Sequence, residues 1–418
     1  IGLVGSRIQQ RLEQVRRGTS RVVEEDHIVI LGWSGKVIPI IRELQAGLEN
    51  GRQVYVLHTE MPIDAVELRM RKSFRRNRST RWVIRQGSMT DLKDLEVLSI
   101  EHARVVIVLQ RDFGQERGDA QVVKTVMAAS HLIVDAGIPA GRQPLLVAEI
   151  LNPSMVRLAH AAAKDVPISI IEPLEQLSKI ILQTARQHGL VDVYQEVLSH
   201  HANEIHLTPA ASLAGHGWED VVFSFRSAVP LGVYRDGRAL LLPGGEGKDF
   251  RVREGDMIVA LARDEIGMRV SAPDIPEYPS EPEETAVCAQ KPVRHILMLG
   301  WNDKVYPMLK EYAAYARALT SQFSVTVVSP GIPAALTTEA LTGAIESGDE
   351  LAVTLQRLDY LRAGVYEELQ PGRFDAIIVL GDTWEVAQIE DADTRVIMTL
   401  LLLRSLRAKD GGGTNALL

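Results

Sequence analysis

The segment HIVILGWSGKVIPII at residues 27–41 returns as HILMLGWNDKVYPML at residues 295–309. The two segments share eight of fifteen residues, among them the Gly-Trp pair and the Lys-Val pair that follow the apolar run. A second match keeps nearly the same offset, because IVLQRD at 107–112 parallels IVLGDT at 378–383. Self-similarity at a fixed offset indicates a repeated structural unit. The chain therefore contains two copies of one unit.

Within the first copy, short apolar runs alternate with stretches of helical periodicity. Continuous apolar strands separated by helices predict a parallel sheet covered on both faces, which is a doubly wound, Rossmann-like fold. The expected strands are Ile28–Leu31, Val54–Leu57, Trp82–Ile84, Val105–Leu109, Leu145–Ala148 and Ile168–Ile171. The expected helices are Val37–Leu48, Asp64–Phe74, Leu92–Leu98, Asp119–Ala136 and Ser154–Ala163.

The chain between the two copies has a different character. Short strand patterns with Gly-rich turns predict a small β-rich lobe, with a hairpin turn at Asp236-Gly237. A segment rich in proline and acidic residues follows and reads as a linker. The predicted organisation is a connector helix at 1–20, a first Rossmann-like domain with crossover helices at 21–200, the β-rich lobe at 201–270, the linker at 271–292 and a second Rossmann-like domain at 293–418. Since the second copy lacks counterparts of strands five and six, it is either a shorter unit or an incomplete one, and we favour the second reading.

Composition excludes several classes of function. Lys+Arg number 46 and Asp+Glu 54 in 418 residues, so the net charge is −8 and a generic polyanion binder is excluded. The single cysteine, Cys288, allows neither an internal disulfide nor a cysteine-based zinc site. No run of about 18 apolar residues is present, so these residues contain no expected transmembrane helix. No catalytic motif of a hydrolase, metalloprotease or P-loop enzyme is found, and we expect no enzymatic activity.

The first residues, IGLVGSRIQQRLEQVRRG, carry an apolar stripe at helical spacing followed by arginines. Positive charge of this kind is typical of the cytoplasmic side of a membrane helix. We therefore expect a connector that leads in from a pore outside these residues. A solvated amphipathic helix is the alternative.

The loop after the first strand occupies the place of a dinucleotide-binding fingerprint. That fingerprint, G-x-G-x-x-G, uses its glycines to admit a pyrophosphate. Here Gly32-Trp33-Ser34-Gly35 departs from this pattern, which argues against nucleotide binding. Trp33 either covers a ligand or fills the emptied crevice, and the second is favoured because a large ring needs few polar partners. The candidate ligand crevice comprises Gly32, Trp33, Ser34, Gly35, Glu60 and Asp112.

Acidic residues follow the fourth strand of each copy. In the first copy they include Asp112, Glu116 and Asp119, and in the second Asp382. Carboxylate oxygens suit calcium. They lack the spacing of a D-x-D-x-D-G loop, so the hypothesis rests on residue type alone.

A basic run, RMRKSFRRNRSTRWVIR, spans residues 69–85. Its charge density suits phosphate or lipid headgroups. The alternative, which we favour, is a solvated helix face whose cations pair with acids such as Asp91, Asp94 and Glu96.

These segments resemble a known family. HIVILGWSGKV, followed by RQGSMTDLKDLEVLSIEHARVVIVLQRD and LVAEILNPSMVRLA, is similar to the CASTOR/POLLUX ion channels. More broadly, the chain resembles the regulator-of-potassium-conductance (RCK, or TrkA-type) domains over nearly its whole length. The GW-[SN]-x-K loop is specific to the CASTOR/POLLUX branch, whereas AEI-x-[ND]-P is shared by the wider class.

The resemblance implies a cytosolic gating ring beneath a cation pore. Four chains would form the ring, and ligand binding would pull on the connector. It implies calcium as the ligand, with an acid contributed at the start of the β-rich lobe. Glu204 matches that place, while His206 stands where a second acid is expected. Together with the acids after the fourth strand, the metal candidates are Glu204, Glu116 and Asp119. We expect the ring to lie on the cytoplasmic side of a bacterial inner membrane.

Two other functions compete with this one. A soluble, TrkA-like regulatory subunit of a potassium uptake system that binds a nucleotide would use the same fold. A Rossmann oxidoreductase would need an intact fingerprint and a catalytic constellation, and the sequence has neither.

Overall fold

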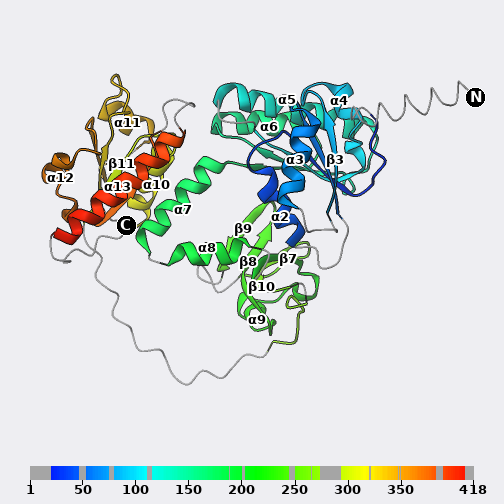
Figure 1. The fold of residues 1–418 in the computed structure, drawn as a ribbon. Helices are drawn as coiled ribbons and strands as arrows, with labels where there is room; N and C mark the ends of the chain where they lie inside the picture. Colours follow the sequence, from blue (N-terminus) through cyan, green and yellow to red (C-terminus); the bar gives the residue numbers. More distant parts are fainter. Residues whose placement is uncertain are drawn as a thin grey trace, which may run out of the picture. The chain divides into compact units, whose positions relative to one another are not determined.

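The computed structural model describes residues 20–46, 53–74, 80–110, 115–187, 189–199, 203–243, 250–264, 266–273, 293–319, 322–346, 348, 350–382 and 389–409. Within these ranges, no helix is both long enough and apolar enough to cross a membrane. The chain divides into two compact units, Ile1–His188 with Lys291–Leu418, and Gly189–Gln290. Each is described by itself (Figure 1).

The first copy is a six-stranded parallel sheet with the order β3-β2-β1-β4-β5-β6. Its order reverses between β1 and β4, which is the topological switch point of a doubly wound fold. All six strands lie where the sequence predicts them, and the Rossmann-like fold class is confirmed. The strands are β1 (His27–Leu31), β2 (Gln53–Thr59), β3 (Thr80–Gln86), β4 (Ala103–Val108), β5 (Leu145–Glu149) and β6 (Ile168–Ile171).

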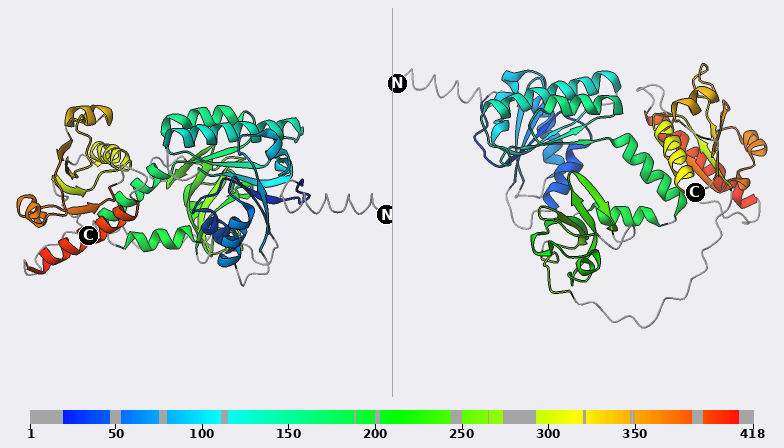
Figure 2. Two further views of the ribbon diagram at one scale, coloured as in Figure 1. Left: turned by 45° about the horizontal axis from the view of Figure 1, so that its top comes forward. Right: turned by 180° about the vertical axis from the view of Figure 1, so that it is seen from behind.

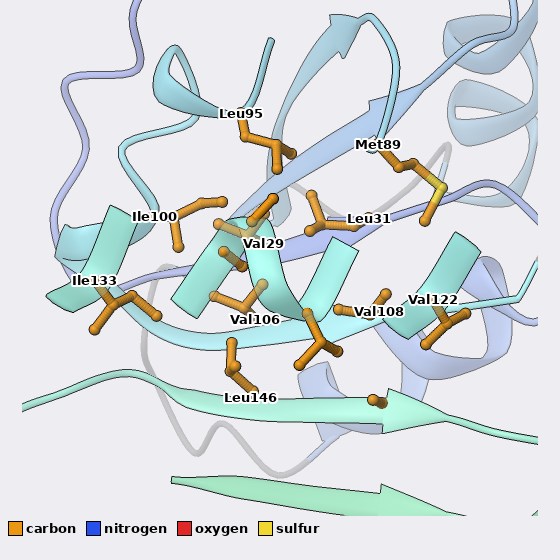
Figure 3. Packing of buried hydrophobic residues seen from close by; sticks show 14 of the residues in the cluster. Val29, Leu31, Met89, Leu95, Ile100, Val106, Val108, Val122, Ile133 and Leu146 are labelled. Atoms are coloured by element: carbon orange, nitrogen blue, oxygen red, sulfur yellow. The ribbon is translucent and has the colours of Figure 1, made fainter. Parts of the chain in front are cut away.

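Helices cover both faces of this sheet (Figure 2). One face packs under α5 (Gln115–Asp135) and α6 (Val156–Ala163), and the other under α2 (Val37–Ala46) and α3 (Ile63–Ser73). The short α4 (Leu92–Glu96) precedes β4. Figure 3 shows Val106, Val108 and Leu146 of neighbouring strands beside Val122 and Ile133 of α5. Because every other strand residue points to the same face, the apolar runs bury both faces.

The second copy repeats the first half of this plan. Its sheet has the order β13-β12-β11-β14, which corresponds to β3-β2-β1-β4. The strands are β11 (Val293–Leu299), β12 (Gln322–Val328), β13 (Leu351–Gln356) and β14 (Ala376–Val379). The helices are α10 (Val305–Leu319), α11 (Thr338–Ala344), α12 (Ala363–Leu369) and α13 (Ile389–Lys409). The repeat seen in the sequence is therefore a repeat of structure.

The helix α7 (Pro173–Arg186) follows the last strand of the first copy but packs into the core of the second. Its Leu182 is fully buried there, with Ile181 and Ala185 against the same cluster. The guanidinium of Arg186 lies 4.4 Å from the ring centroid of Tyr315 on α10. The second core therefore depends on a helix encoded more than a hundred residues before it.

The unit Gly189–Gln290 contains the predicted β-rich lobe, which is confirmed as an antiparallel sheet of order β7-β10-β8-β9. Asp236 and Gly237 both have positive φ (50° and 78°), the conformation that the Asp-Gly hairpin predicts. Inside it, Arg235 donates to both carboxylate oxygens of Asp256 at 2.9 and 2.6 Å. The elements are α8 (Leu190–Leu198), β7 (Glu204–Pro209), α9 (Trp218–Val222), β8 (Ala228–Arg235), β9 (Arg238–Leu241) and β10 (Met257–Ala262).

Candidate functional site

The loop after β1 lies at the switch point, where open α/β sheets bind their ligands. Gly32 has φ +95°, and a Cβ there would lie 2.7 Å from the carbonyl oxygen of Leu109. Only glycine suits this combination of backbone angle and close approach. The Leu109 amide donates to Leu31 at 2.9 Å, which fixes the end of β4 against the loop.

The side chains of this loop point in different directions. Trp33 is 8% exposed and packs with the core under α2 and α3, as a ring that fills space does. Ser34 is buried, and its hydroxyl accepts a hydrogen bond from the Lys36 amide at 3.3 Å. Gly35 is exposed, with no neighbour within 4 Å of where its Cβ would be. The loop thus closes its crevice with Trp33 but leaves Gly35 and Lys36 accessible.

A charged pair spans the switch point. Lys36 forms an ion pair with Glu149 at the carboxyl end of β5, and their side chains are 46% and 6% exposed. The other oxygen of Glu149 accepts a hydrogen bond from the Gln110 amide at 3.3 Å. We call Lys36, Gln110 and Glu149 the first switch-point cluster. The sequence analysis missed Lys36 and Glu149 as a pair. The available signal was their position, since Lys36 lies in the loop after β1 and Glu149 is the last residue of β5.

The predicted metal candidate Asp119 has its oxygens engaged by the protein. Its carboxylate is fully buried and accepts from the amides of Leu151 and Asn152 at 2.9 and 2.8 Å, and from the Gln110 amide nitrogen Nε2 at 3.3 Å. A carboxylate with three donors holds the loop after β5 in place. Asp119 therefore connects the first switch-point cluster to that loop.

The remaining predicted site residues are scattered or lie outside the described part of the chain. Glu60 is exposed just after β2, and its carbonyl accepts from Gln86 at 3.4 Å. Glu204 opens β7, opposite Ala262, in the other compact unit. Asp112 and the side chain of Glu116 lie outside the described residues. Among the described residues, no three His, Cys, Asp or Glu side chains come close enough to hold a metal ion.

The second copy keeps the backbone of this loop and changes its chemistry. Gly300 has φ +109°, and a Cβ there would lie 2.1 Å from the Leu380 carbonyl oxygen. The Asn302 side chain accepts from the Lys304 amide at 2.9 Å, as Ser34 does for Lys36. The two loops are therefore the same turn.

At this second switch point a carboxylate is buried among donors. Asp382, one of the acids that follow the fourth strand of each copy, has a fully buried side chain. It accepts from the Trp301 amide and the Ser329 hydroxyl, each at 2.6 Å, and from the Tyr360 hydroxyl. Arg395 of α13 lies 3.4 Å from it. We call Asp382, Ser329, Tyr360 and Arg395 the second switch-point cluster.

Burial, reinforced by the bond to Asp382, raises the pKa of the Tyr360 hydroxyl above its ordinary value of 10. Tyr360 therefore remains a donor at neutral pH. Hydroxyl, amide and guanidinium groups of the protein surround the Asp382 carboxylate and compensate its buried negative charge. We therefore interpret this cluster as one that stabilises the fold of the second copy.

Different arginines of the basic run pair with different parts of the protein. Arg71 donates to Glu67 at 2.7 Å, Arg81 pairs with Glu24 at 2.9 Å, and Arg85 donates to the Ser20 carbonyl at 2.7 Å. The expected acids have other roles, since Asp91 caps α4 and Asp94 accepts from the Ser88 amide at 2.7 Å. The pairing interpretation thus holds for Arg71 and Arg81 but with different acids.

The chain thus has two Rossmann-like sheets and an antiparallel sheet encoded between them, and its sequence is similar to known proteins. Residues 175–276 match the family described as Castor and Pollux, part of voltage-gated ion channel. The chain is 27% identical over 426 residues to the probable ion channel POLLUX of Arabidopsis thaliana, covering 98% of this chain and 48% of that protein. It is 25% identical over 424 residues to the ion channel CASTOR of Lotus japonicus, covering 98% and 47%. The resemblance to CASTOR and POLLUX channels is confirmed, and the chain spans about half the length of these relatives.

Among solved structures, the chain matches the crystal structure of the GsuK RCK domain with a TM-score of 0.44 and 15% identity, covering 98% of this chain and 77% of that one. It also matches the GsuK channel bound to NAD, with a TM-score of 0.39 and 14% identity, covering 98% and 68%.

Proposed function

We propose that this chain forms the cytosolic, ligand-sensing gating-ring domains of a tetrameric cation channel. The observation that carries the proposal is its similarity to CASTOR and POLLUX channels over 98% of its length, with both Rossmann-like copies and the lobe included. The ring would lie on the cytoplasmic side of a membrane and act on the channel's pore. We propose no enzymatic reaction for it.

The proposed work of the ligand is a population shift. A ligand changes the open fraction only through different affinities for the open and closed rings. Moving the pore from about 1% to about 99% open needs about 5.5 kcal/mol in total. Divided over four equivalent sites, this is about 1.4 kcal/mol each, or about a tenfold preference per site. Modest local changes at each chain would therefore suffice.

We propose that the ligand acts at the first copy rather than the second. The first switch-point cluster has an exposed cation paired with a nearly buried carboxylate, so an arriving ion or ligand can exchange with one partner. Calcium is the proposed ligand, because the carboxylate of Glu149 would attract a hard cation and would repel the phosphates of a nucleotide. Glu204 of the lobe remains a second candidate ligand.

The test combines calorimetric titration of the purified chain with calcium and light scattering for its mass. The expected result is saturable binding by a particle of about four times the 46.1 kDa chain mass, weakened by Glu149→Gln or Glu204→Gln. Asp119→Asn is a poor probe, since its loss would also release the loop after β5. The proposal fails if the chain is monomeric and binds no calcium.

The alternative, a soluble TrkA-like subunit, is distinguished by adding a nucleotide such as NAD in the same titration. Nucleotide binding by a particle that also captures a separate membrane subunit would favour it. Nucleotide binding without calcium binding by a tetramer would keep the ring and change the ligand.

A further inference from the structure

The basic run borders a hollow on the first Rossmann-like copy. Its cavity volume is about 530 Å³, and its lining residues belong to the end of α3 and to the strand β3; Figure 1 labels both elements. We call it the α3–β3 hollow. Its lining residues are Leu68, Arg71, Lys72, Phe74 and Trp82.

The floor of the hollow is apolar and aromatic. Phe74 is 7% exposed, and its ring centroid lies 6.2 Å from that of Trp82 at a tilt of 46°. Leu68 is 55% exposed, although it is a large apolar side chain on a helix with polar neighbours. Trp is favoured where one end of a site is apolar and the other is wet. The floor is therefore suited to the boundary between water and an apolar phase.

The rim of the hollow is cationic. Arg71 and Lys72 occupy the last turn of α3 and are both exposed. Arg71 pairs with Glu67, whose Oε1 accepts from Arg71 Nε at 3.1 Å and from Nη2 at 2.7 Å. Both members of this pair are exposed, at 70% and 37%, so the pair is weak. Glu67 thus offsets part of the positive charge at the rim.

The surrounding sequence reinforces this charge. Residues 69–85 contain eight Lys or Arg and no Asp or Glu, in a chain whose net charge is −8. A local excess of positive charge attracts anions to this part of the surface. Arg81 pairs with Glu24 and Arg85 donates to Ser20. Of the described cations of the run, Arg71 and Lys72 line the hollow.

We propose that the α3–β3 hollow binds the headgroup and upper acyl region of an anionic phospholipid at a membrane surface. Cations at the rim would pair with the phosphate, while Leu68 and Trp82 would contact the glycerol and first methylenes. Free inorganic phosphate would satisfy the rim but not the floor. This proposal goes beyond the gating-ring function, because it concerns attachment to the lipid and needs no gating ligand.

The test is sedimentation of the full chain with vesicles at roughly 0.1 M salt, where the Debye length is about 10 Å. We expect binding to mixed phosphatidylglycerol and phosphatidylcholine vesicles and little to phosphatidylcholine alone. Arg71→Gln with Lys72→Gln should lower the partition coefficient about tenfold or more. The matched control, Lys124→Gln with Arg142→Gln, removes the same charge from exposed positions elsewhere on this unit and should lower it less than threefold.

Two further variants separate lipid binding from general electrostatics. Glu67→Gln should raise the partition coefficient, because it releases Arg71, and simple loss of folding cannot produce that increase. Leu68→Asp should lower it more than Met127→Asp, which places the same charge at a position of similar exposure, 53%, on α5.

Depth is read from fluorescence. Lipids brominated near the glycerol should quench part of the tryptophan emission, and Trp82→Phe should remove that part. Equal binding by the rim variant and its control would overturn the proposal, as would competition by millimolar inorganic phosphate alone. Saturable binding of an acidic peptide, together with no binding to the anionic vesicles, would point to a protein partner and also overturn it.

Discussion

The two switch points of this molecule share a backbone and differ in what they do with charge. Both loops use a glycine at positive φ, a tryptophan and a side chain that accepts from the amide two residues later. In the first copy, the charged groups are an exposed lysine and its glutamate. In the second, Asp382 is enclosed by four groups from the surrounding structure. The comparison shows that, at the switch point, one copy of a repeated fold can keep an accessible charged group while the other copy buries a carboxylate that stabilises its structure.

The largest effect is expected at the second switch-point cluster. Asp382→Ala leaves Ser329, Tyr360 and Arg395 without their shared acceptor, and should cost about 3–5 kcal/mol in the free energy of unfolding. The measurement is urea unfolding, monitored by hydrogen exchange of peptides from the second copy. Asp359→Ala, the control, removes a partly exposed partner of Arg395 and should cost about 1 kcal/mol. Equal losses of unfolding free energy in the two variants would contradict a stabilising role for the buried cluster.

The next effect concerns the helix that the first copy contributes to the second. Leu182→Ala removes a fully buried side chain from the second core and should cost about 2–5 kcal/mol. Hydrogen exchange should locate the loss in β11 to β14. Leu177→Ala on the same helix is the control, since that side chain is 45% exposed and its truncation should cost about 0.5 kcal/mol or less. Equal protection of the second sheet in both variants would show that α7 is not part of its core.

The glycines test whether the two loops are the same turn. Gly300→Ala and Gly32→Ala each force a side chain into positive φ against a carbonyl oxygen, and should cost about 1–3 kcal/mol or more. Gly300→Ala should cost more, because its Cβ would approach to 2.1 Å rather than 2.7 Å. Gly35→Ala has open space and should change stability by less than about 1 kcal/mol. Thermal unfolding of the three variants decides the order.

The smallest effect is a pH dependence at the residues that open the two repeats. His27 is fully buried, its Nε2 lies 3.0 Å from the Leu98 carbonyl, and burial lowers its pKa below the ordinary 6.5. The imidazole of His27 therefore binds a proton more readily in the unfolded chain than in the folded chain. Stability from this residue is present above the unfolded pKa and is lost as the pH falls, with a slope of at most about 1.4 kcal/mol per pH unit.

The measurement for His27 is the free energy of unfolding between about pH 7 and pH 5. His27→Gln should flatten the decline relative to the unmodified chain. The control is His295→Gln, which changes the exposed histidine at the same place in the second copy. A slope that is unchanged in His27→Gln would contradict the buried neutral histidine.

Much of the fold could be predicted from the sequence because its signals are local. Apolar runs bounded by turns predict the strands, and the repeat at His27 and His295 predicts the second sheet from the first. The Asp-Gly pair at 236–237 predicts a hairpin because few other residues accept positive φ twice in succession.

The clusters could not be predicted, because they depend on which strands are neighbours. Lys36 and Glu149 are far apart in the sequence and meet only because β5 lies beside β4 at the switch point. Asp382 follows a strand as any loop acid does, and only the convergence of Ser329, Tyr360 and Arg395 buries it. The packing of α7 into the second core likewise leaves no local trace.

The central claim is that ligand acts at the first switch point and not at the second. Hydrogen exchange of the purified chain with and without calcium tests it most directly. The account predicts added protection in peptides covering Gly32–Lys36 and the segment after β5, with no change around Gly300–Lys304 and Asp382, and loss of the response in Glu149→Gln. Protection confined to the second switch point, or a response unchanged by Glu149→Gln, would contradict it.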